Sequence, residues 1–581
     1  MSTAMGALLP DVGAAAEDST PSDSQAGPGT PPPAVETPQG CPSGATSCPC
    51  KPLPCNLVTT RRYYESRSFS FDTRSLVPER VDSCIARRYE IDAQEIGVGG
   101  YGRVYTAKDR MFKDRRVAIK KLVRHQDDKL EAFKLEVDIM KELDHPNICR
   151  LFETYLEDEL LFFVIEYLEG GDLCDLIMEK RTVEEGLAAY IIKQASSAVR
   201  YAHRQGIAHR DMKPENVCFC SRDPTDHRVK VIDWGLGKHF SQTRMKSSVG
   251  SGAFTAPEVL DPPGEDAGYT SACDLWSLGV MAYVLLSGKP PFYGGPIQML
   301  RNMREERYPM SGTFWDGVPA DAKSFIARLL KCTPEERLSA ESLLLHPWLA
   351  RQFVEVDGAV FGQIIANVEH FSHAPDFLSV CVASVARQLD HRSLDNIYKV
   401  FIMLDANGDG VLDLSELKVG FVKVFGEGSD EVAEVDSMFA HLDLDHTGGI
   451  TYTEFCAAGI GESSYTQEHV LWAAFKTFDV NDNGRITRDN MQEVLTRADV
   501  NQVWSEGVCN DVAHQVTDCF GSQGGLNFEE WLNLMRESAS QHAERTPRRR
   551  TTNVIEVGVD DVFGSALRSE VAKPGTAATP S

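Results

Sequence analysis

The hydrophobic pattern divides the chain into stretches of different character. Residues 1–80 show no sustained periodicity and are dominated by Pro, Gly, Ser, Thr and Ala. Such a segment cannot bury enough apolar surface to offset its loss of conformational entropy, so we predict a disordered extension there. A regular pattern begins at residue 88, where the runs Val117–Ile119 and Leu161–Ile165 predict strands.

The same region also contains helical spacing. Apolar residues three and four positions apart predict an amphipathic helix over residues 127–143; they are Leu130, Phe133, Val137 and Met140. Short strands are predicted at Val217–Cys220 and Val229–Ile232. The apolar stretch Leu275–Leu286 contains Ser and Gly and is too short to span a bilayer, so it predicts a buried helix.

The second half of the chain contains an internal repeat of about 36 to 40 residues, and each copy has a loop of twelve residues. Before the first copy, apolar residues make one face of a predicted helix: Phe377, Leu378, Cys381, Val385 and Leu389. After the last copy, residues 540–581 are mostly polar and include Arg548–Arg550. We interpret this segment as a flexible tail, with a docking or localisation patch as the alternative.

Length and charge narrow the class of protein. A chain of 581 residues exceeds what one hydrophobic core supports, so two or more domains are expected. With 59 Lys and Arg against 85 Asp and Glu, the net charge is −26, which argues against nucleic acid or an anionic membrane as the main partner. The 15 cysteines are scattered, and we find no signal peptide and no transmembrane segment. We therefore expect a cytoplasmic location and leave peripheral membrane association open.

The loop Ala208–Asn216 has the pattern of a phosphoryl-transfer site. Asp211 would accept the proton of a substrate hydroxyl, and Asn216, five residues later, would hold a magnesium ion. This spacing lets both groups reach one phosphoryl group from a single tight loop. On its own the pattern could be an ordinary polar loop, so the interpretation depends on the other parts of the site.

A glycine-rich segment lies upstream and would place backbone N–H groups against nucleotide phosphates. We assign its residues to ATP binding: Ile96, Gly97, Val98, Gly99, Gly100, Tyr101, Gly102, Arg103 and Val104. The same glycine spacing marks dinucleotide-binding folds, but those require a helix directly after the glycines. This sequence instead continues into a second strand that ends in Lys120, which would hold the α- and β-phosphates.

Further residues complete this interpretation. Glu136, sixteen residues after Lys120, is the candidate partner of its ammonium, with an ordinary surface glutamate as the alternative. Glu166 and Leu168 lie in the segment expected to contact the nucleotide base. Asp233 follows a predicted strand and would chelate the magnesium that bridges the β- and γ-phosphates.

With these motifs, residues 88–348 resemble a eukaryotic protein kinase over its whole length. The resemblance implies a bilobal α+β fold with ATP and Mg²⁺ as cofactors, and an ion pair between Arg337 and Glu258. The catalytic residues it implies are Asp211, Lys213, Asn216, Lys120 and Glu136, of which Lys213 points to the Ser/Thr class. Protein substrates follow, and Glu215 and Asp172 hint at basic residues near the acceptor hydroxyl.

The twelve-residue loops have the ligand spacing of calcium-binding EF-hands, with a glycine at position 6 for the sharp turn. In loop 1, residues 405–416, the ligands at positions 1, 3, 5, 7 and 12 would be Asp405, Asn407, Asp409, the Val411 carbonyl and Glu416. In loop 2, residues 443–454, they would be Asp443, Asp445, Thr447, the Gly449 carbonyl and Glu454. We predict Ca²⁺ binding at both loops, because Thr447 lowers the charge but keeps an oxygen.

The remaining copies are degenerate. Loop 3, residues 479–490, would offer Asp479, Asn481, Asn483 and the Arg485 carbonyl, but position 12 is Asn490. Losing the bidentate glutamate predicts weak or absent calcium binding. The fourth copy keeps Glu530 at position 12 but has Cys519, Gly521 and Gln523 at positions 1, 3 and 5. We therefore expect it to pair with loop 3 structurally through Ile486 and Leu526, as Leu412 would pair loop 1 with loop 2.

A kinase followed by a calmodulin-like domain resembles the calcium-dependent protein kinases of plants and protists. The resemblance implies six segments: a disordered extension (1–80), the kinase domain (88–349), a junction (350–394), a calcium-binding EF-hand pair (395–460), a degenerate pair (465–537) in the same all-α domain, and a flexible tail (540–581). It also implies a Ser/Thr kinase that the junction holds inactive. Calcium opens the EF-hand pairs, which then bind the junction and release the kinase.

Three features depart from the family's pattern. Residues 352–386 contain no Lys or Arg, so we predict inhibition by apolar or steric contact instead of a basic pseudosubstrate. Ser247 and Ser248 stand where an acidic residue is usual, and phosphorylation there would supply the charge, with serines of no role as the alternative. Trp234 replaces the phenylalanine that usually follows the magnesium-binding aspartate.

Two other functions stay open at this point. The chain could be a calcium-sensor scaffold whose kinase fold is inactive. It could also be a constitutively active kinase whose EF-hands serve partner binding, an alternative that the non-basic junction supports.

Overall fold

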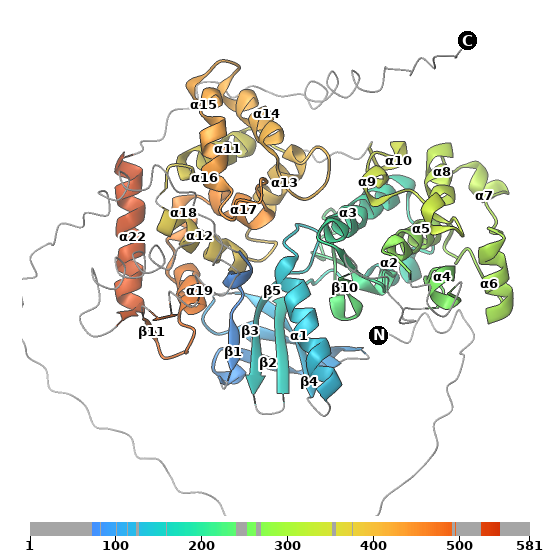
Figure 1. Ribbon diagram of the computed structural model, residues 1–581, viewed down its shortest axis with the longest axis horizontal. Helices are drawn as coiled ribbons and strands as arrows, with labels where there is room; N and C mark the ends of the chain where they lie inside the picture. Colours follow the sequence, from blue (N-terminus) through green and yellow to red (C-terminus); the bar gives the residue numbers. More distant parts are fainter. Residues whose placement is uncertain are drawn as a thin grey trace, which may run out of the picture. The chain divides into compact units, whose positions relative to one another are not determined.

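The computed structural model describes residues 73–545, with gaps at 82, 100–101, 113, 124–126, 158–159, 240–251, 263–268, 351–355, 375, 488, 491–493 and 495–524 (Figure 1). All described residues belong to one folded unit. The predicted extension before residue 73, the tail after residue 545, Gly100 with Tyr101, and Ser247 with Ser248 lie outside the described residues.

A six-stranded sheet with one helix forms the first lobe. The strand order is β1-β5-β6-β4-β3-β2, in which β1 runs parallel to β5 and the other neighbours are antiparallel. The elements are η2 (Thr73–Leu76), β1 (Glu79–Val81), η3 (Ile85–Arg87), β2 (Tyr89–Gly99), β3 (Gly102–Asp109), β4 (Arg116–Val123), α1 (Asp127–Glu142), β5 (Leu151–Glu157) and β6 (Leu160–Glu166). Residues 73–80, assigned to the extension by their composition, thus contribute a short helix and most of an edge strand.

The amphipathic pattern of α1 determines how it packs. Phe133, Val137 and Met140 are buried, and the Phe133 ring lies 4.5 Å from the ring of Phe163 on β6. The side chain of Leu130 lies outside the described residues. This packing places the middle of α1, which carries Glu136, against the sheet that carries Lys120.

The second lobe is mainly helical. Its elements are α2 (Leu173–Lys180), α3 (Glu185–Arg204), β7 (Ile207–Ala208), η4 (Pro214–Asn216), β8 (Val217–Phe219), β9 (Val229–Val231), η5 (Trp234–Leu236), β10 (Lys238–His239), α4 (Pro257–Leu260), α5 (Ala272–Ser287), α6 (Pro296–Arg304), α7 (Thr313–Asp316), α8 (Ala320–Leu329), η6 (Pro334–Glu336), α9 (Ala340–Leu343) and α10 (Pro347–Ala350). The apolar stretch from Leu275 to Leu286 is buried throughout, as predicted. Arg337 Nη1 lies 2.6 Å from Glu258 Oε1, so the expected ion pair is formed.

Helices continue from residue 358. They are α11 (Gly358–Phe371), α12 (Asp376–Gln388), α13 (Asp395–Leu404), α14 (Leu414–Phe425), α15 (Asp430–Ala433), α16 (Val435–Leu442), α17 (Tyr452–Gly459), α18 (Glu462–Tyr465), α19 (Glu468–Phe478) and α22 (Phe528–Arg545), with strands β11 (Arg485–Ile486) and β12 (Leu526–Asn527). None of the helices in the described ranges is long and apolar enough to cross a bilayer.

The helices before loop 1 share one core with the loop-bearing helices. Leu378, Cys381, Val385 and Leu389 of the predicted apolar face are buried there, while the side chain of Phe377 lies outside the described residues. Neighbouring loops pair as their apolar eighth positions predict. Leu412 bridges Ile450, and Ile486 in β11 pairs with Leu526 in β12.

Candidate active site and metal-binding loops

Three charged groups meet between the two lobes. Lys120 Nζ on β4 lies 2.6 Å from Glu136 Oε1 on α1 and 3.1 Å from Asp233 Oδ1 after β9. Burial disfavours the ammonium ion, but the two carboxylates outweigh it and raise the pKa of Lys120. Burial also opposes the charge of Asp233, yet Lys120 lowers the pKa of that carboxyl. The site therefore keeps a charged lysine beside a carboxylate, as phosphate and metal binding require.

The catalytic loop is fixed by hydrogen bonds from its own backbone. The buried carboxylate of Asp274 on α5 accepts from His209 N at 2.9 Å and from Arg210 N at 2.7 Å. Asn216 Nδ2 donates to the Asp211 carbonyl at 2.8 Å, and Lys213 Nζ donates to Asp211 Oδ2 at 2.6 Å. The predicted general base and its two neighbours are thus brought together on one loop.

The tryptophan after Asp233 fits the lobe without displacing the carboxylate. Trp234 is fully buried, and its ring lies 4.6 Å from the ring of His209 in the catalytic loop. Asp233 has a left-handed backbone with φ of 60°, and its side chain still reaches Lys120. A Cβ at Gly235 would lie 3.2 Å from Glu136 Oε2. A larger residue at this position would therefore crowd the carboxylate of Glu136.

The predicted nucleotide-binding segment is a hairpin. Gly97 pairs with Val104, Val98 with Arg103 and Gly99 with Gly102, so β2 and β3 run to the tip of the turn. A Cβ at Gly102 would lie 2.5 Å from the carbonyl oxygen of Lys121, so this position excludes larger residues. The hairpin lies next to β4, which carries Lys120, and so fits a phosphate chain held between glycine backbone and lysine.

Glu166 has a role that its sequence position does not suggest. Its buried carboxylate lies 2.9 Å from Lys230 Nζ and 2.9 Å from His391 Nδ1, which belongs to the segment after α12. Burial opposes its charge, but Lys230 and His391 hold the pKa of this carboxyl well below its usual range. Any contact with a nucleotide base would therefore come from the backbone of Glu166 and from Leu168.

Loop 1 is an acidic cage of the kind that takes a divalent cation. The buried Asp405 carboxylate accepts from Asp409 N at 3.0 Å and from Gly410 N at 2.9 Å. Burial and the neighbouring Glu416 and Asp409 raise the pKa of Asp405 to about 8, and burial raises the pKa of Glu416 to about 7. Carboxylates crowded in this way need a cation to remain charged together, so the donor set fits calcium.

Loop 2 gathers its ligands more tightly. One carboxylate oxygen each from Asp443, Asp445 and Glu454 lie within 4.8 Å of one another. Thr447 Oγ1 donates to the Gly449 carbonyl at 3.2 Å, which keeps both predicted ligands at the loop. Thr451 and Glu454 also form a capping box at the start of α17, as Asp413 and Glu416 do for α14. The twelfth residue of each loop thus caps the helix that follows it.

In loop 3, the ammonium group of a lysine side chain already binds the acidic residues. Lys476 Nζ on α19 lies 2.6 Å from Asp479 Oδ2 and also binds Asp482. Asn490 Oδ1 at position 12 accepts from Thr487 N at 3.0 Å, and Asn483 Oδ1 accepts from Arg485 N at 2.9 Å. Sequence reasoning missed Lys476, although a lysine three residues before position 1 was visible as a signal.

Sequence reasoning also missed the contacts between the kinase-like lobes and the later helices. Asp144, just after α1, accepts from Arg387 Nη1 at 2.9 Å, from Thr453 N at 2.8 Å and from Thr453 Oγ1 at 2.9 Å. Arg150 Nη1 donates to the Ala386 carbonyl at 2.7 Å. The end of α12 and the start of α17 therefore meet the segment that connects α1 to β5.

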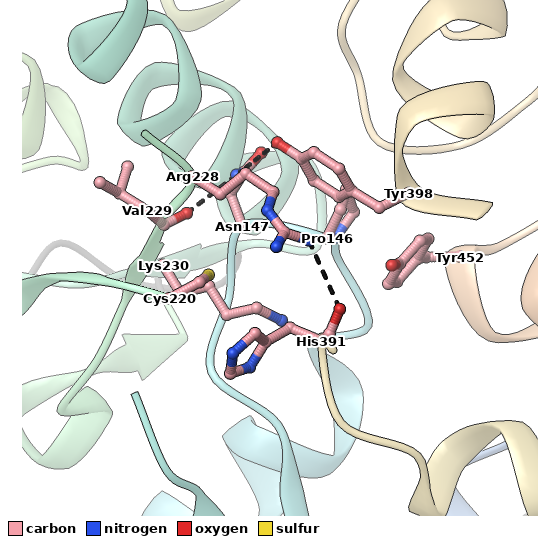
Figure 2. A pocket seen from close by; sticks show the side chains of 9 residues that line it. All are labelled: Pro146, Asn147, Cys220, Arg228, Val229, Lys230, His391, Tyr398 and Tyr452. Atoms are coloured by element: carbon pink, nitrogen blue, oxygen red, sulfur yellow. Dashed lines mark hydrogen bonds between the residues drawn. The ribbon is translucent and has the colours of Figure 1, made fainter. Parts of the chain in front are cut away.

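Figure 2 shows a pocket along this contact. Side chains from the second lobe, from the α1–β5 connection and from the later helices line it together: Pro146, Asn147, Cys220, Arg228, Val229, Lys230, His391, Tyr398 and Tyr452. Asn147 Nδ2 donates to the Val229 carbonyl at 2.9 Å and reaches Tyr398 Oη at 3.4 Å. A polar network thus joins these parts of the fold.

Comparison with known proteins agrees with this geometry. Residues 90–349 match the family model of the protein kinase domain, and residues 394–458 match that of the EF-hand domain pair. The chain is 32% identical over 462 residues to calcium-dependent protein kinase 3 of Plasmodium berghei, covering 77% of this chain and 80% of the relative. It is 32% identical over 452 residues to calcium-dependent protein kinase 5 of Plasmodium falciparum, covering 77% of this chain and 78% of that relative. With its kinase fold and its EF-hand loops, the chain belongs to the family of calcium-dependent protein kinases.

Proposed function

We propose that this chain transfers the γ-phosphate of ATP to serine or threonine in proteins, and that calcium at loops 1 and 2 switches this activity on. The observation that carries the proposal is the assembled Lys120–Glu136–Asp233 cluster, with its 2.6 Å ion pair, in a chain that also holds two acidic EF-hand loops. A scaffold with an inactive kinase fold would have no need of this cluster.

In this proposal the chain's own residues position the reactants. Lys120 holds the α- and β-phosphates, and Asp211 accepts the proton of the substrate hydroxyl. Lys213, 2.6 Å from Asp211 Oδ2, faces the same reaction centre and favours a Ser/Thr acceptor. Asp233 and Asn216 would hold Mg²⁺, which supplies charge neutralisation for the phosphates when bound.

The regulatory path that we propose runs through α12. Its last residues contact Asp144 and Arg150, and Asp144 follows α1 by two residues. Because α1 carries Glu136, a change in how α12 is held would reach the Lys120–Glu136 pair. Since the helices of loops 1 and 2 share a core with α12, calcium has a physical route to the catalytic cluster. The junction would thus act through its packing and its contacts with Asp144 and Arg150, and not as a basic pseudosubstrate, since residues 352–386 contain no Lys or Arg.

One assay tests the proposal directly. Phosphorylation of a basic Ser/Thr peptide should be fast with calcium and slow with a calcium chelator, and the Asp211→Asn variant should be inactive in both. Equal rates with and without calcium would favour the constitutive kinase. No activity in either condition would favour the calcium-sensor scaffold.

We predict that the chain binds two calcium ions and not three. The Asp479→Asn substitution should leave the stoichiometry at two, because loop 3 has Asn490 in place of the bidentate glutamate and Lys476 already pairs with Asp479. The Asp443→Asn substitution should reduce it to one strong site. Isothermal titration calorimetry counts the sites. A third site that Asp479→Asn removes would contradict this assignment.

Substrate selection gives a further prediction. The carboxylates of Asp172, Asp175 and Glu215 lie near one another, and burial together with the negative charges of Asp175 and Glu215 raises the pKa of Asp172. We propose that the carboxylate of Glu215 pairs with a substrate arginine. Glu215→Gln should lower kcat/KM for a basic peptide about tenfold, and an alanine-substituted peptide should lose this sensitivity.

A cytoplasmic location is also part of the proposal. Nine cysteines in the described ranges are free thiols, as expected of a reducing compartment. Fractionation of cells that express the chain would check it, and recovery with membranes would favour the peripheral association left open above.

A further inference from the structure

Loop 1 lies directly on helix α3 of the kinase domain. Arg204 Nη1 forms an ion pair with Asp409, the position-5 ligand, and Arg200 Nη1 donates to the Asn407 carbonyl at 2.7 Å. Ser197 Oγ donates to the Gly408 carbonyl at 2.9 Å. Three consecutive residues of the metal-binding loop are therefore held by side chains of the kinase domain.

We infer that Arg204 is an internal cation that competes with calcium for Asp409 in loop 1. The inference rests on the proposed calcium binding at this loop and goes beyond it. It assigns to a kinase-domain residue a role in setting the calcium affinity of one EF-hand.

The hydrogen bonds of Asp409 leave one oxygen for either cation. Asp409 Oδ1 accepts from Val411 N at 3.1 Å, while Oδ2 is the atom bound to Arg204. The Asp409 side chain is 9% exposed, so water is a poor substitute for a charged partner there. An ion that uses Oδ2 must displace the guanidinium or share that oxygen with it, and one that uses Oδ1 must still bind beside a fixed positive charge. Both cases lower the calcium affinity of loop 1.

Loop 2 provides an internal comparison. Its position 5 is Thr447, which carries no charge for an arginine to pair with, and three of its carboxylates converge within 4.8 Å. That convergence involves positions 1, 3 and 12, and loop 1 has Asn407 at position 3, so the two loops differ there by composition. The arginine contact at position 5 belongs to loop 1 because only loop 1 has a carboxylate at that position.

The fit of loop 1 against the kinase domain makes the contact specific. A Cβ at Gly410 would lie 2.1 Å from His145 Cδ2, and one at Gly408 would lie 2.9 Å from Leu344 Cδ1. Glu341 holds the guanidinium in place, because its Oε1 accepts from Arg204 Nε at 3.2 Å. The arginine is thus positioned from both sides and does not depend on a chance surface contact.

Competition for one carboxylate couples metal binding to domain contact. If the ion pair lowers calcium affinity, calcium must weaken the ion pair by the same factor. Calcium at loop 1 would therefore loosen this part of the loop–α3 contact, while the hydrogen bonds from Ser197 and Arg200 to backbone carbonyls would persist.

The test measures calcium binding to the full chain. The Glu454→Gln substitution first silences loop 2, so that calorimetry with CaCl₂ reports loop 1. In this background, Arg204→Gln should tighten calcium binding at least about fivefold, the lower end of ordinary coupling between sites. Arg204→Lys keeps the charge and should restore most of the weaker affinity.

Arg301→Gln is the matched control, because it removes one positive charge from α6, where Arg301 pairs with Glu305 on its own helix. It should leave the calcium affinity unchanged. Unchanged or weaker binding in Arg204→Gln would overturn the inference, as would equal tightening in Arg301→Gln. Absence of calcium binding at loop 1 in the Glu454→Gln parent would instead overturn the proposed function.

Discussion

Asp211→Asn is expected to slow phosphoryl transfer by about 10²–10⁴-fold, the usual contribution of a general base. The asparagine has the same shape and can still accept from Lys213, which lies 2.6 Å from the carboxylate oxygen that it would replace. The loop should keep its position, because Asp274 holds the backbone N–H groups of His209 and Arg210. The loss would therefore report chemistry and not unfolding.

The measurement is single-turnover phosphorylation of a Ser/Thr peptide at saturating calcium, with the melting temperature recorded for each variant. Asp223→Asn is the matched control, because Asp223 is an exposed residue of the same lobe whose carboxylate accepts from Thr225 and lies outside the predicted site. It should keep the native rate. A near-native rate in Asp211→Asn would remove Asp211 from the reaction.

Glu416→Gln combined with Glu454→Gln is expected to abolish calcium stimulation at micromolar calcium. The twelfth residue supplies the bidentate ligand of each EF-hand, and sensor sites with all ligands have dissociation constants of about 10⁻⁷–10⁻⁵ M. Gln keeps the capping boxes of α14 and α17, in which Glu416 and Glu454 accept from the backbone of Asp413 and Thr451. The helices should therefore form while the ions bind poorly.

The control for this double variant is Glu427→Gln with Glu434→Gln, which changes two exposed glutamates of the same EF-hand pair. That variant should retain both calcium binding and stimulation. If the Glu416→Gln, Glu454→Gln chain were still activated at micromolar calcium, the switch would lie outside loops 1 and 2.

The sequence predicts those parts of the site whose residues have fixed local spacing. Lys120 and Glu136 form their ion pair because a strand and an amphipathic helix in this order bring them face to face, and both are visible in the hydrophobic pattern. The pairing of Leu412 with Ile450 follows in the same way, since each is the apolar eighth residue of its loop.

Contacts between distant segments carry no such signal. Arg204 and Asp409 are 205 residues apart, and Arg387 and Asp144 are 243 apart. From the sequence alone, an arginine on a helix is expected to be a solvated surface residue. Its partner becomes known only when the fold places another segment against that helix. Strand β1 was missed for a different reason, because three residues are too few to show a period of two.

The resemblance to the family gives only a general mechanism, and the structure adds the contacts that belong to this chain. The absence of Lys and Arg from residues 352–386 argues against a basic pseudosubstrate. The contacts of Asp144 and Arg150 with the end of α12 are the basis of the route that we propose from the EF-hands to α1. Arg387 follows this stretch directly and pairs with Asp144.

The central claim is that calcium bound at loops 1 and 2 controls phosphoryl transfer at Asp211. Its most direct test is one calcium titration in which bound calcium and peptide phosphorylation are measured on the same preparation. We predict that the rate rises over the same range of free calcium in which two ions bind, and that both curves disappear together in the Glu416→Gln, Glu454→Gln chain. A phosphorylation rate that stays constant while two calcium ions bind would contradict the claim.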